Sequence, residues 1–189
     1  MQNASISLNP RIRRAAHRMA RGAVVAYPTE AVWGLGCDPN NPEAVGRILA
    51  LKQRPWQKGM ILLAAEMSYF APLVDRLDSG LRQRLQESWP GPVTWLVPAA
   101  DLVPEWVRGQ FETVALRVTD HPLAAGLSRA FGGPIISTSA NPAGKPEART
   151  ALEVRRYFRD QLDDITPGRV GGRAQPSQIR DLVSGKILR

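Results

Sequence analysis

Residues 41–64 read NPEAVGRILALKQRPWQKGMILLA, and the succession of features in this stretch decides the class of fold. Asn41 and Pro42 form a helix start, and apolar residues then recur at helical spacing as far as Lys52. A short basic loop leads into 60–64, an apolar run with the length of a buried strand. A helix that is followed directly by a buried strand predicts an α/β fold.

The same alternation extends along the chain without a break in composition. Helices are predicted from Pro10 to before Gly22 and at 42–52, 66–74, 78–88, 122–131 and 150–158, and strands at 23–27, 32–37, 60–64, 93–97, 114–118, 134–138, 179–183 and 186–188. We therefore expect a single α/β domain over residues 1–189, with its core at about 10–188 and helices packed on a twisted sheet of mixed parallel and antiparallel strands.

Three properties of the chain limit its class. No apolar run reaches the roughly 18 residues of a transmembrane helix, so we expect no membrane span. Cys37 is the only cysteine, and the basic N-terminal region lacks the apolar core of a secretory signal; both features favour a cytoplasmic protein. One cysteine and two histidines, His17 and His121, are too few for a zinc site, so a metal would arrive with a ligand.

The chain is strongly basic, with a formal net charge of +8. Such a charge indicates polyanionic partners, for which nucleotides and nucleic acid are candidates. Arginine supplies 21 of the 25 cations, and an arginine-rich solvated surface would explain the charge equally well. The charge alone does not decide between these two explanations.

Chemistry is first indicated by the basic loop that contains Lys52, Arg54 and Lys58. Lys52 and Arg54 follow the predicted helix, where cations compensate the helix dipole. That explanation covers Lys52, but it does not cover a loop that stays basic until the next strand. A lysine as a point charge and an arginine as a fork are suited to holding a triphosphate.

A second polar segment, Ser137-Thr138-Ser139-Ala140-Asn141-Pro142, follows an apolar strand. Runs of Ser, Thr and Asn are most often turns and caps. Here the segment lies at a strand end, which is where ligands gather in open α/β folds. Neutral hydrogen-bonding groups in such a place are suited to a phosphorylated ligand.

Two charged residues near other strands are further candidates. Glu30 follows Thr29 just after a predicted strand, and it is a general base, a magnesium-shell group or an ordinary loop acid. Arg117 interrupts the apolar strand 114–118, so it faces water or pairs with an anion such as a substrate carboxylate. Together these segments make a nucleotide-handling enzyme the leading hypothesis.

Five motifs carry a family resemblance: YPTEAVWGLG at 27–36, LKQRP at 51–55, WPGPVT at 89–94, LRVTDHP at 116–122 and STSAN at 137–141. In this order and spacing the chain resembles the YrdC/TsaC family of threonylcarbamoyl-AMP synthases, from about Ala16 to Ile187. The length matches the short bacterial form of that family, which implies a single YrdC-like domain.

The resemblance implies a reaction in which L-threonine, bicarbonate and ATP, with Mg²⁺, give L-threonylcarbamoyladenylate and pyrophosphate. The product would supply the threonylcarbamoyl group of N6-threonylcarbamoyladenosine (t6A) at position 37 of tRNAs that read ANN codons. Partner proteins of tRNA modification would make the transfer.

The resemblance also implies roles for individual residues. The family's four phosphate-binding residues fall on Lys52, Arg54, Ser139 and Asn141, of which Lys52 and Arg54 would be catalytic. The other expected ATP-binding residues are Lys58, Thr113, Ser137 and Arg149, and the expected threonine-binding residues are Thr29, Arg117 and Ser177.

The sequence departs from the family pattern at three positions. Many members carry Asn and, five residues later, His, where this chain has Lys58 and Leu63. A contact made by that Asn or His is absent here or replaced, with Lys58 as the candidate. Trp33 stands where Tyr is common. Because the mixed anhydride is prone to hydrolysis, we also expect a closing loop, and the glycine-rich segment 168–178 is the candidate.

The competing hypothesis is an RNA-binding protein of the same fold without catalysis. A basic chain with Trp56, Trp89, Trp95 and Trp106 is suited to binding tRNA or double-stranded RNA through shape and phosphates. RNA contact through a basic surface could also accompany the enzymatic activity. The two hypotheses differ in whether mutation of the four phosphate-binding residues abolishes nucleotide turnover or only RNA binding.

Overall fold

The computed structural model describes residues 9–98 and 100–189. Its α-helices are α2 (Pro10–Met19), α3 (Pro42–Lys52), α4 (Ala71–Val74), α5 (Ser79–Ser88), α6 (Glu105–Arg108), α7 (Pro122–Phe131) and α8 (Ala151–Phe158). Its strands are β1 (Val25–Pro28), β2 (Trp33–Gly36), β3 (Ile61–Ala64), β4 (Val93–Pro98), β5 (Thr113–Val118), β6 (Ile135–Ser139), β7 (Asp164–Ile165) and β8 (Gln178–Asp181). Short 3-10 helices lie at Trp56–Lys58, Met67–Phe70, Ala100–Leu102 and Arg159–Gln161.

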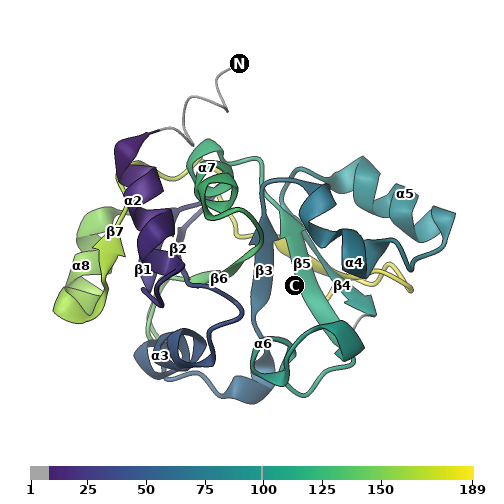
Figure 1. Ribbon diagram of the computed structural model, residues 1–189, viewed down its shortest axis with the longest axis horizontal. Coiled ribbons are helices and arrows are strands. Elements are labelled where there is room, and N and C mark those ends of the chain that lie inside the picture. The colour runs from purple at the N-terminus through teal and green to yellow at the C-terminus, as the bar shows by residue number, and fades with distance from the viewer. Residues whose placement is uncertain (1–8, 99) are drawn as a thin grey trace.

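The strands form one sheet in the order β7-β1-β2-β6-β3-β5-β4-β8 (Figure 1). The pairs β1/β7, β3/β5 and β4/β8 are parallel, and the other neighbours are antiparallel. The predicted mixed α/β fold is therefore confirmed. Strand β6 sets Ser139 opposite Gly34 of β2 and Ser137 opposite Ile61 of β3, so three polar segments that are distant in sequence meet in the sheet.

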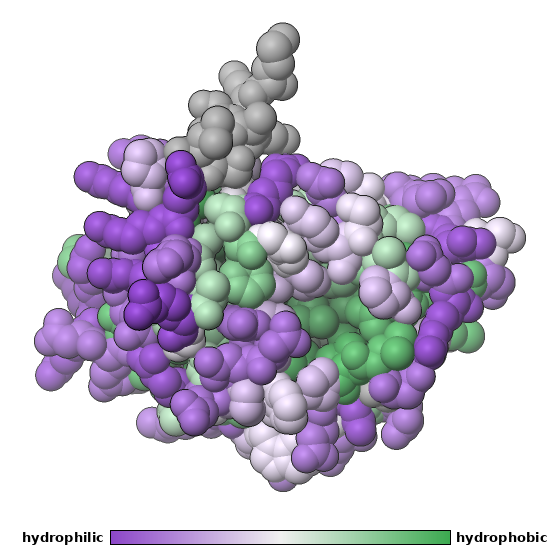
Figure 2. Space-filling view, viewed as in Figure 1, coloured by the Kyte–Doolittle hydropathy of each residue, from purple (hydrophilic) through white to green (hydrophobic). Residues whose placement is uncertain are grey.

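Alternate residues of the central strands belong to different apolar clusters. Leu62 of β3 lies in the larger cluster, and its neighbour Leu63 lies in a smaller one with residues of α2 and α7. These two helices pack against each other (Figure 1). Figure 2 shows hydrophilic side chains over the outer parts of one face and an apolar hollow over its middle strands.

Side-chain caps start four helices where the sequence predicts them. Asn9, Asn41 and Asp78 each accept a hydrogen bond from a backbone N–H in the first turn of α2, α3 and α5. Thr150 and Glu153 form the predicted capping box of α8. These starts depend only on neighbouring residues, which explains why a local pattern predicts them.

Region 66–74 is not the single helix expected from its sequence. It forms a 3-10 helix at Met67–Phe70 and then α4, because Pro72 has no N–H and its ring would clash with the carbonyl group four residues earlier. Segment 186–188 is not a strand, since Ile187 makes only an isolated bridge to Arg180. The short elements α6 and β7 were not expected.

Among the described residues, no helix has both the length and the apolar surface that a bilayer crossing needs. The predicted domain limits include residues 1–8, which lie outside the described residues.

Candidate functional site

A cleft of about 370 Å³ lies beside β6, β3, β5 and β4, and its wall also includes the loop after β1 and segment 173–177. Cations dominate this wall: Arg54, Lys58, Arg108, Arg117, Arg173 and Arg189. The carboxylate side chains on the wall are those of Glu30 and Glu147. A cleft with this excess of positive charge is suited to a ligand that carries several negative charges.

Lys52, the last residue of α3, is buried, with 6% of its surface exposed. Its ammonium group donates to the backbone carbonyl of Ser139, to the carbonyl of Asn141 at 2.9 Å and to Asn141 Oδ1 at 3.1 Å. Ser139 Oγ donates to the same Oδ1 at 2.7 Å. Since an ammonium group has three N–H donors, all of them are in use. Lys52 therefore acts on the cleft through the loop that it holds.

The pKa of Lys52 is lowered from 10.5 to about 8. Burial is the main cause, the charge of Arg54 acts in the same direction, and Glu147 opposes it. A buried lysine with a depressed pKa beside a cleft is typical of a functional site.

A close backbone approach shapes the basic loop. Arg54 Nη2 donates to the carbonyls of Lys58 at 3.2 Å and Gly59 at 3.0 Å. Gly59 has a φ of +59°, and a Cβ there would lie 2.6 Å from the carbonyl oxygen of Arg108, so only glycine permits this contact. The contact holds Arg108 beside the loop. The pKa of Arg54 is lowered mainly by burial and also by the charge of Arg189, so these two cations repel each other.

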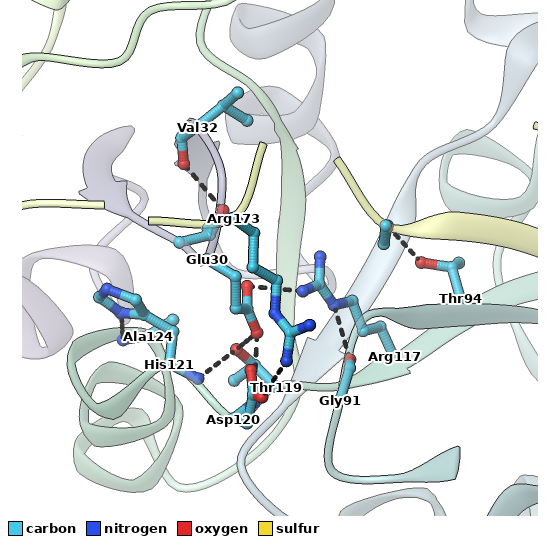
Figure 3. Close-up of polar contacts among 12 residues, drawn as sticks. Glu30, Val32, Gly91, Thr94, Arg117, Thr119, Asp120, His121, Ala124 and Arg173 are labelled. Carbon is cyan, nitrogen blue, oxygen red and sulfur yellow. Dashed lines mark hydrogen bonds and ion pairs between the residues drawn. The ribbon is translucent and has the colours of Figure 1, made fainter. Parts of the chain in front are cut away.

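A buried ion pair forms another part of the wall (Figure 3). Arg117 Nη2 lies 2.5 Å from Glu30 Oε2, and both side chains are less than one tenth exposed. Arg117 Nε donates to the carbonyl of Gly91 at 3.3 Å. Arg117 was expected either to face water or to pair with an anion, and it pairs with an anion. Glu30 is not an exposed loop acid, which was one of the three interpretations of this residue.

The glycine-rich segment 168–178 is bonded to the loop after β1. The N–H of Gly171 donates to the carbonyl of Thr29 at 3.0 Å, and the N–H of Arg173 donates to the carbonyl of Glu30 at 3.0 Å. A Cβ at Gly171 would lie 3.2 Å from Glu30 Cα, so a larger residue would push the segment away. The segment lies along the cleft wall, and its role as a closing loop stays a prediction.

Most of the predicted site residues meet at this cleft. Those that line it are Thr29, Arg54, Lys58, Thr113, Arg117, Ser137, Ser139 and Ser177. Lys52 and Asn141 contact it through Ser139, as described above. Arg149 is exposed and donates to the carbonyl of Ala174 at 2.7 Å, so it contacts the cleft only through that segment. The roles assigned to these residues stay predictions.

Sequence reasoning missed Arg108, Arg173 and Arg189 among the cleft cations. No local pattern distinguishes them from the other arginines of the chain. At the departures from the family pattern, Lys58 lines the cleft, whereas Leu63 is fully buried in the apolar cluster with α2 and α7.

The described residues do not fit a protein-held metal ion. No three His, Cys, Asp or Glu side chains among them form a group that could hold one. Glu30, on the cleft wall, is already paired with Arg117.

The structure corrects the part of the RNA hypothesis that rests on tryptophans, because one of the four is exposed and the other three are buried or half-buried. Trp89 and Trp95 are buried because both pack in the larger apolar cluster. Trp106 is half-buried and donates from Nε1 to the carbonyl of Pro39 at 3.1 Å. Trp56, at 44% exposure, is the one of the four that could stack on a base.

An α/β fold with a cation-rich cleft beside the strands of its mixed sheet is typical of a protein that binds a phosphorylated ligand. Comparison with known proteins identifies the family. The family model Sua5_yciO_yrdC, described as telomere recombination, matches residues 17–189. The chain belongs to the Sua5/YciO/YrdC family.

Individual relatives cover most of the chain. A Cellvibrio japonicus protein named threonylcarbamoyl-AMP synthase is 61% identical over 183 residues, which is 97% of each chain. A Pseudomonas putida protein of the same name is 54% identical over 179 residues, which is 95% of this chain and 96% of that protein.

Solved structures agree with the fold. P. abyssi Sua5 in complex with L-threonine has a TM-score of 0.87 at 32% identity, over 94% of this chain and 53% of that chain, so the present chain spans about half of that protein. E. coli YciO has a TM-score of 0.83 at 24% identity, over 94% of this chain and 87% of that one, and supports the fold alone.

Proposed function

We propose that the chain is an L-threonylcarbamoyladenylate synthase, which forms threonylcarbamoyl-AMP and pyrophosphate from L-threonine, bicarbonate and ATP. The observation that carries the proposal is the single cleft in which cations, the hydroxyl groups of β6 and a buried arginine come together. A triphosphate and a carboxylate need these groups at the same time. Close relatives that bear this name and a related Sua5 that binds L-threonine support it.

The reaction has two chemical steps. Bicarbonate takes up a proton and loses water to give CO₂, and the neutral amine of threonine bonds to the carbon of CO₂ and releases a proton, which gives N-carboxythreonine. An oxygen of this carbamate then attacks the α-phosphorus in line, and the bond from that phosphorus to the leaving pyrophosphate breaks. Both steps depend on positioning, charge neutralisation and exclusion of water, and neither needs a protein nucleophile.

The phosphates are expected to lie against Arg54, Lys58 and Ser139, all on the cleft wall. Arg54 and Lys58 would neutralise the charge that develops on the leaving pyrophosphate. Lys52 would fix the loop that carries Ser139 and Asn141, because its three donors are bound there.

Threonine is expected to lie against Arg117 and Thr29. Arg117 has N–H groups that neither Glu30 nor Gly91 uses, and these would bind the substrate carboxylate. We propose that Mg²⁺ arrives as part of the ATP substrate, where it reduces the charge of the triphosphate. We further propose that the protein acts in the cytoplasm and that tRNA-modification proteins use the product for t6A.

Pyrophosphate release tests the proposal. It is measured with ATP and Mg²⁺ while L-threonine and bicarbonate are added singly and together, and release is expected only with both. Arg54→Ala should lose most of this activity, whereas Arg76→Ala, which removes an exposed arginine paired with Asp101, should keep it. Pyrophosphate release in the absence of both L-threonine and bicarbonate would contradict the proposed activity. So would the absence of release in every mixture.

A second candidate function is contact with tRNA through a basic hollow beside α2. Four arginines line this hollow, namely Arg14, Arg18, Arg21 and Arg47. Asp163 and Asp164 pair with three of them, so the cations outnumber these carboxylates four to two. Binding through phosphates weakens steeply with salt. We expect tRNA affinity to fall between about 50 and about 200 mM salt and to fall further in Arg14→Gln/Arg21→Gln. An unchanged affinity in that variant would exclude this surface.

A further inference from the structure

Glu30 is a buried carboxylate on the cleft wall that the steps above do not use. It lies between β1 and β2 and is 4% exposed. Its Oε1 accepts a hydrogen bond from the Thr119 hydroxyl at 2.6 Å and one from the Asp120 N–H at 3.2 Å. Its Oε2 lies 2.5 Å from Arg117 Nη2 in an ion pair that lacks hydrogen-bond geometry (Figure 3).

Stability does not explain this buried pair. Taking two charges out of water is costly, and an apolar pair of similar volume is often as stable or more stable. Glu30 and Arg117 are nevertheless both held below one tenth exposure on the wall of a cleft. Their arrangement is better explained by what the cleft binds.

The guanidinium of Arg117 is fixed from two directions. Glu30 holds Nη2, and the Gly91 carbonyl accepts from Nε at 3.3 Å. Figure 3 shows the other terminal nitrogen directed away from both partners. A guanidinium binds a carboxylate best through two parallel N–H bonds, which requires a fixed plane. Glu30 and Gly91 fix that plane before a ligand arrives.

We propose that Glu30 is a positioning residue for the substrate carboxylate and that it acts through Arg117. This inference rests on the function proposed above. Charge alone predicts the opposite effect, because the negative Glu30 repels a second carboxylate and its removal would tighten threonine binding. Positioning predicts weaker threonine binding, so the sign of the change separates the two explanations.

Glu30→Gln makes the test sharp because an amide cannot replace this carboxylate. One side of the amide is a donor. If it faces Arg117, that contact is lost; if it faces the Asp120 N–H, Arg117 keeps only a neutral acceptor, so the charge that pairs with Arg117 is gone in both orientations. We expect the KM for L-threonine to rise about 10- to 100-fold and the KM for ATP to stay within about threefold. Glu66→Gln makes the same chemical change in the surface pair with Arg129 and should leave both values unchanged.

A double-mutant cycle shows whether Glu30 acts through Arg117. In an Arg117→Gln background, Glu30→Gln should change the KM for threonine by less than about threefold, because the residue that it positions is gone. If Glu30→Gln changes the KM for threonine by the same factor in the wild-type and the Arg117→Gln background, the inference is overturned. A lower KM for threonine in Glu30→Gln would also overturn it, as would a lower kcat with both KM values unchanged, which is the result of a merely structural role.

Direct binding separates this inference from the proposed function. Calorimetric titration with L-threonine needs no turnover, and it should show weaker binding to Glu30→Gln than to the wild type. Wild-type protein that releases no pyrophosphate in response to threonine would contradict the function itself. Threonine-dependent release by the wild type together with unchanged threonine affinity in Glu30→Gln would overturn only the role of Glu30.

Discussion

Replacement of Lys52 by methionine is expected to leave the fold nearly as stable as the wild type while most activity is lost. Methionine has a similar length and no charge. The pKa of Lys52 is about 8 instead of 10.5. Since a tenfold change in proton affinity is worth about 1.4 kcal/mol, burial of the charged form at neutral pH costs about 3 kcal/mol, and Lys52→Met removes this cost.

Lost hydrogen bonds oppose that gain. The carbonyl of Asn141 loses its donor. The carbonyl of Ser139 keeps the Asn141 N–H at 3.0 Å, and Asn141 Oδ1 keeps the Ser139 hydroxyl. Each buried acceptor left without a partner costs about 1–3 kcal/mol, and less where water reaches it, as it can at the cleft. We therefore expect the free energy of unfolding to change by at most about 2 kcal/mol in either direction. The value of kcat/KM should fall roughly 10- to 150-fold, because the loop that carries Ser139 loses its anchor.

The pH dependence of stability gives a second measurement for the same variant. Between about pH 8 and pH 10.5 the unfolded protein binds more protons at Lys52 than the folded protein does, so the free energy of unfolding rises with pH in this window. The wild type should gain about 1.3 kcal/mol over Lys52→Met between about pH 7 and about pH 9 in urea unfolding. Cys37, whose pKa is raised to about 12 by burial, acts in the opposite direction above about pH 9 in both proteins, so their difference is the quantity to compare.

Two results would refute the reasoning about Lys52. The first is a loss of more than about 2 kcal/mol in Lys52→Met, which would mean that the hydrogen bonds outweigh the cost of the buried charge. The second is an equal difference between wild type and variant at both pH values, which would mean that the pKa of Lys52 is not lowered.

Three further predictions concern other parts of the chain. Arg54→Ala should lower kcat/KM for ATP roughly 10- to 150-fold and leave L-threonine binding in calorimetry intact; an equal loss for both ligands would contradict a phosphate role. Thr150→Ala removes the capping box of α8 and should lower the free energy of unfolding by about 1 kcal/mol, with activity unchanged; unaltered urea unfolding would mean that the cap contributes nothing. The Cys37 thiol should resist a disulfide reagent at about pH 8 in the native protein and react fully in urea, since burial raises its pKa to about 12; rapid native labelling would show that this part of the fold opens easily.

Local signals predicted much of the fold. Helix starts at Asn41 and Thr150 depend on a side chain and the N–H groups two or three residues away, and such contacts are visible in the sequence. Gly132 ends α7 with a φ of 93°, as a glycine after the last helical residue predicts. The apolar runs likewise gave β3 and β5 nearly to the residue.

Contacts between distant segments could not be predicted in this way. Pairing of β6 with both β2 and β3 joins the polar loops into one site, and it depends on the packing of the whole sheet. Arg108 reaches the cleft only because Gly59 and Gly109 let two backbones touch, and nothing near Arg108 in the sequence indicates that contact. The partner of Arg117 was missed for the same reason, because Glu30 is far away in the chain.

Lys52 and Arg117 differ from the cations that surround them at the site in how deeply they are buried. Lys52 and Arg117 are both less than a tenth exposed, and acceptors of the protein itself already bind them. Lys58 and Arg173 are exposed, and Arg173 pairs with Asp120 at 2.8 Å. If a buried cation moved toward a ligand, the buried acceptor that it leaves would lose its hydrogen-bond donor, which is costly. A buried cation therefore keeps a fixed geometry. The exposed cations are therefore suited to attracting the anions, and Lys52 and Arg117 are suited to fixing the positions of the reacting groups.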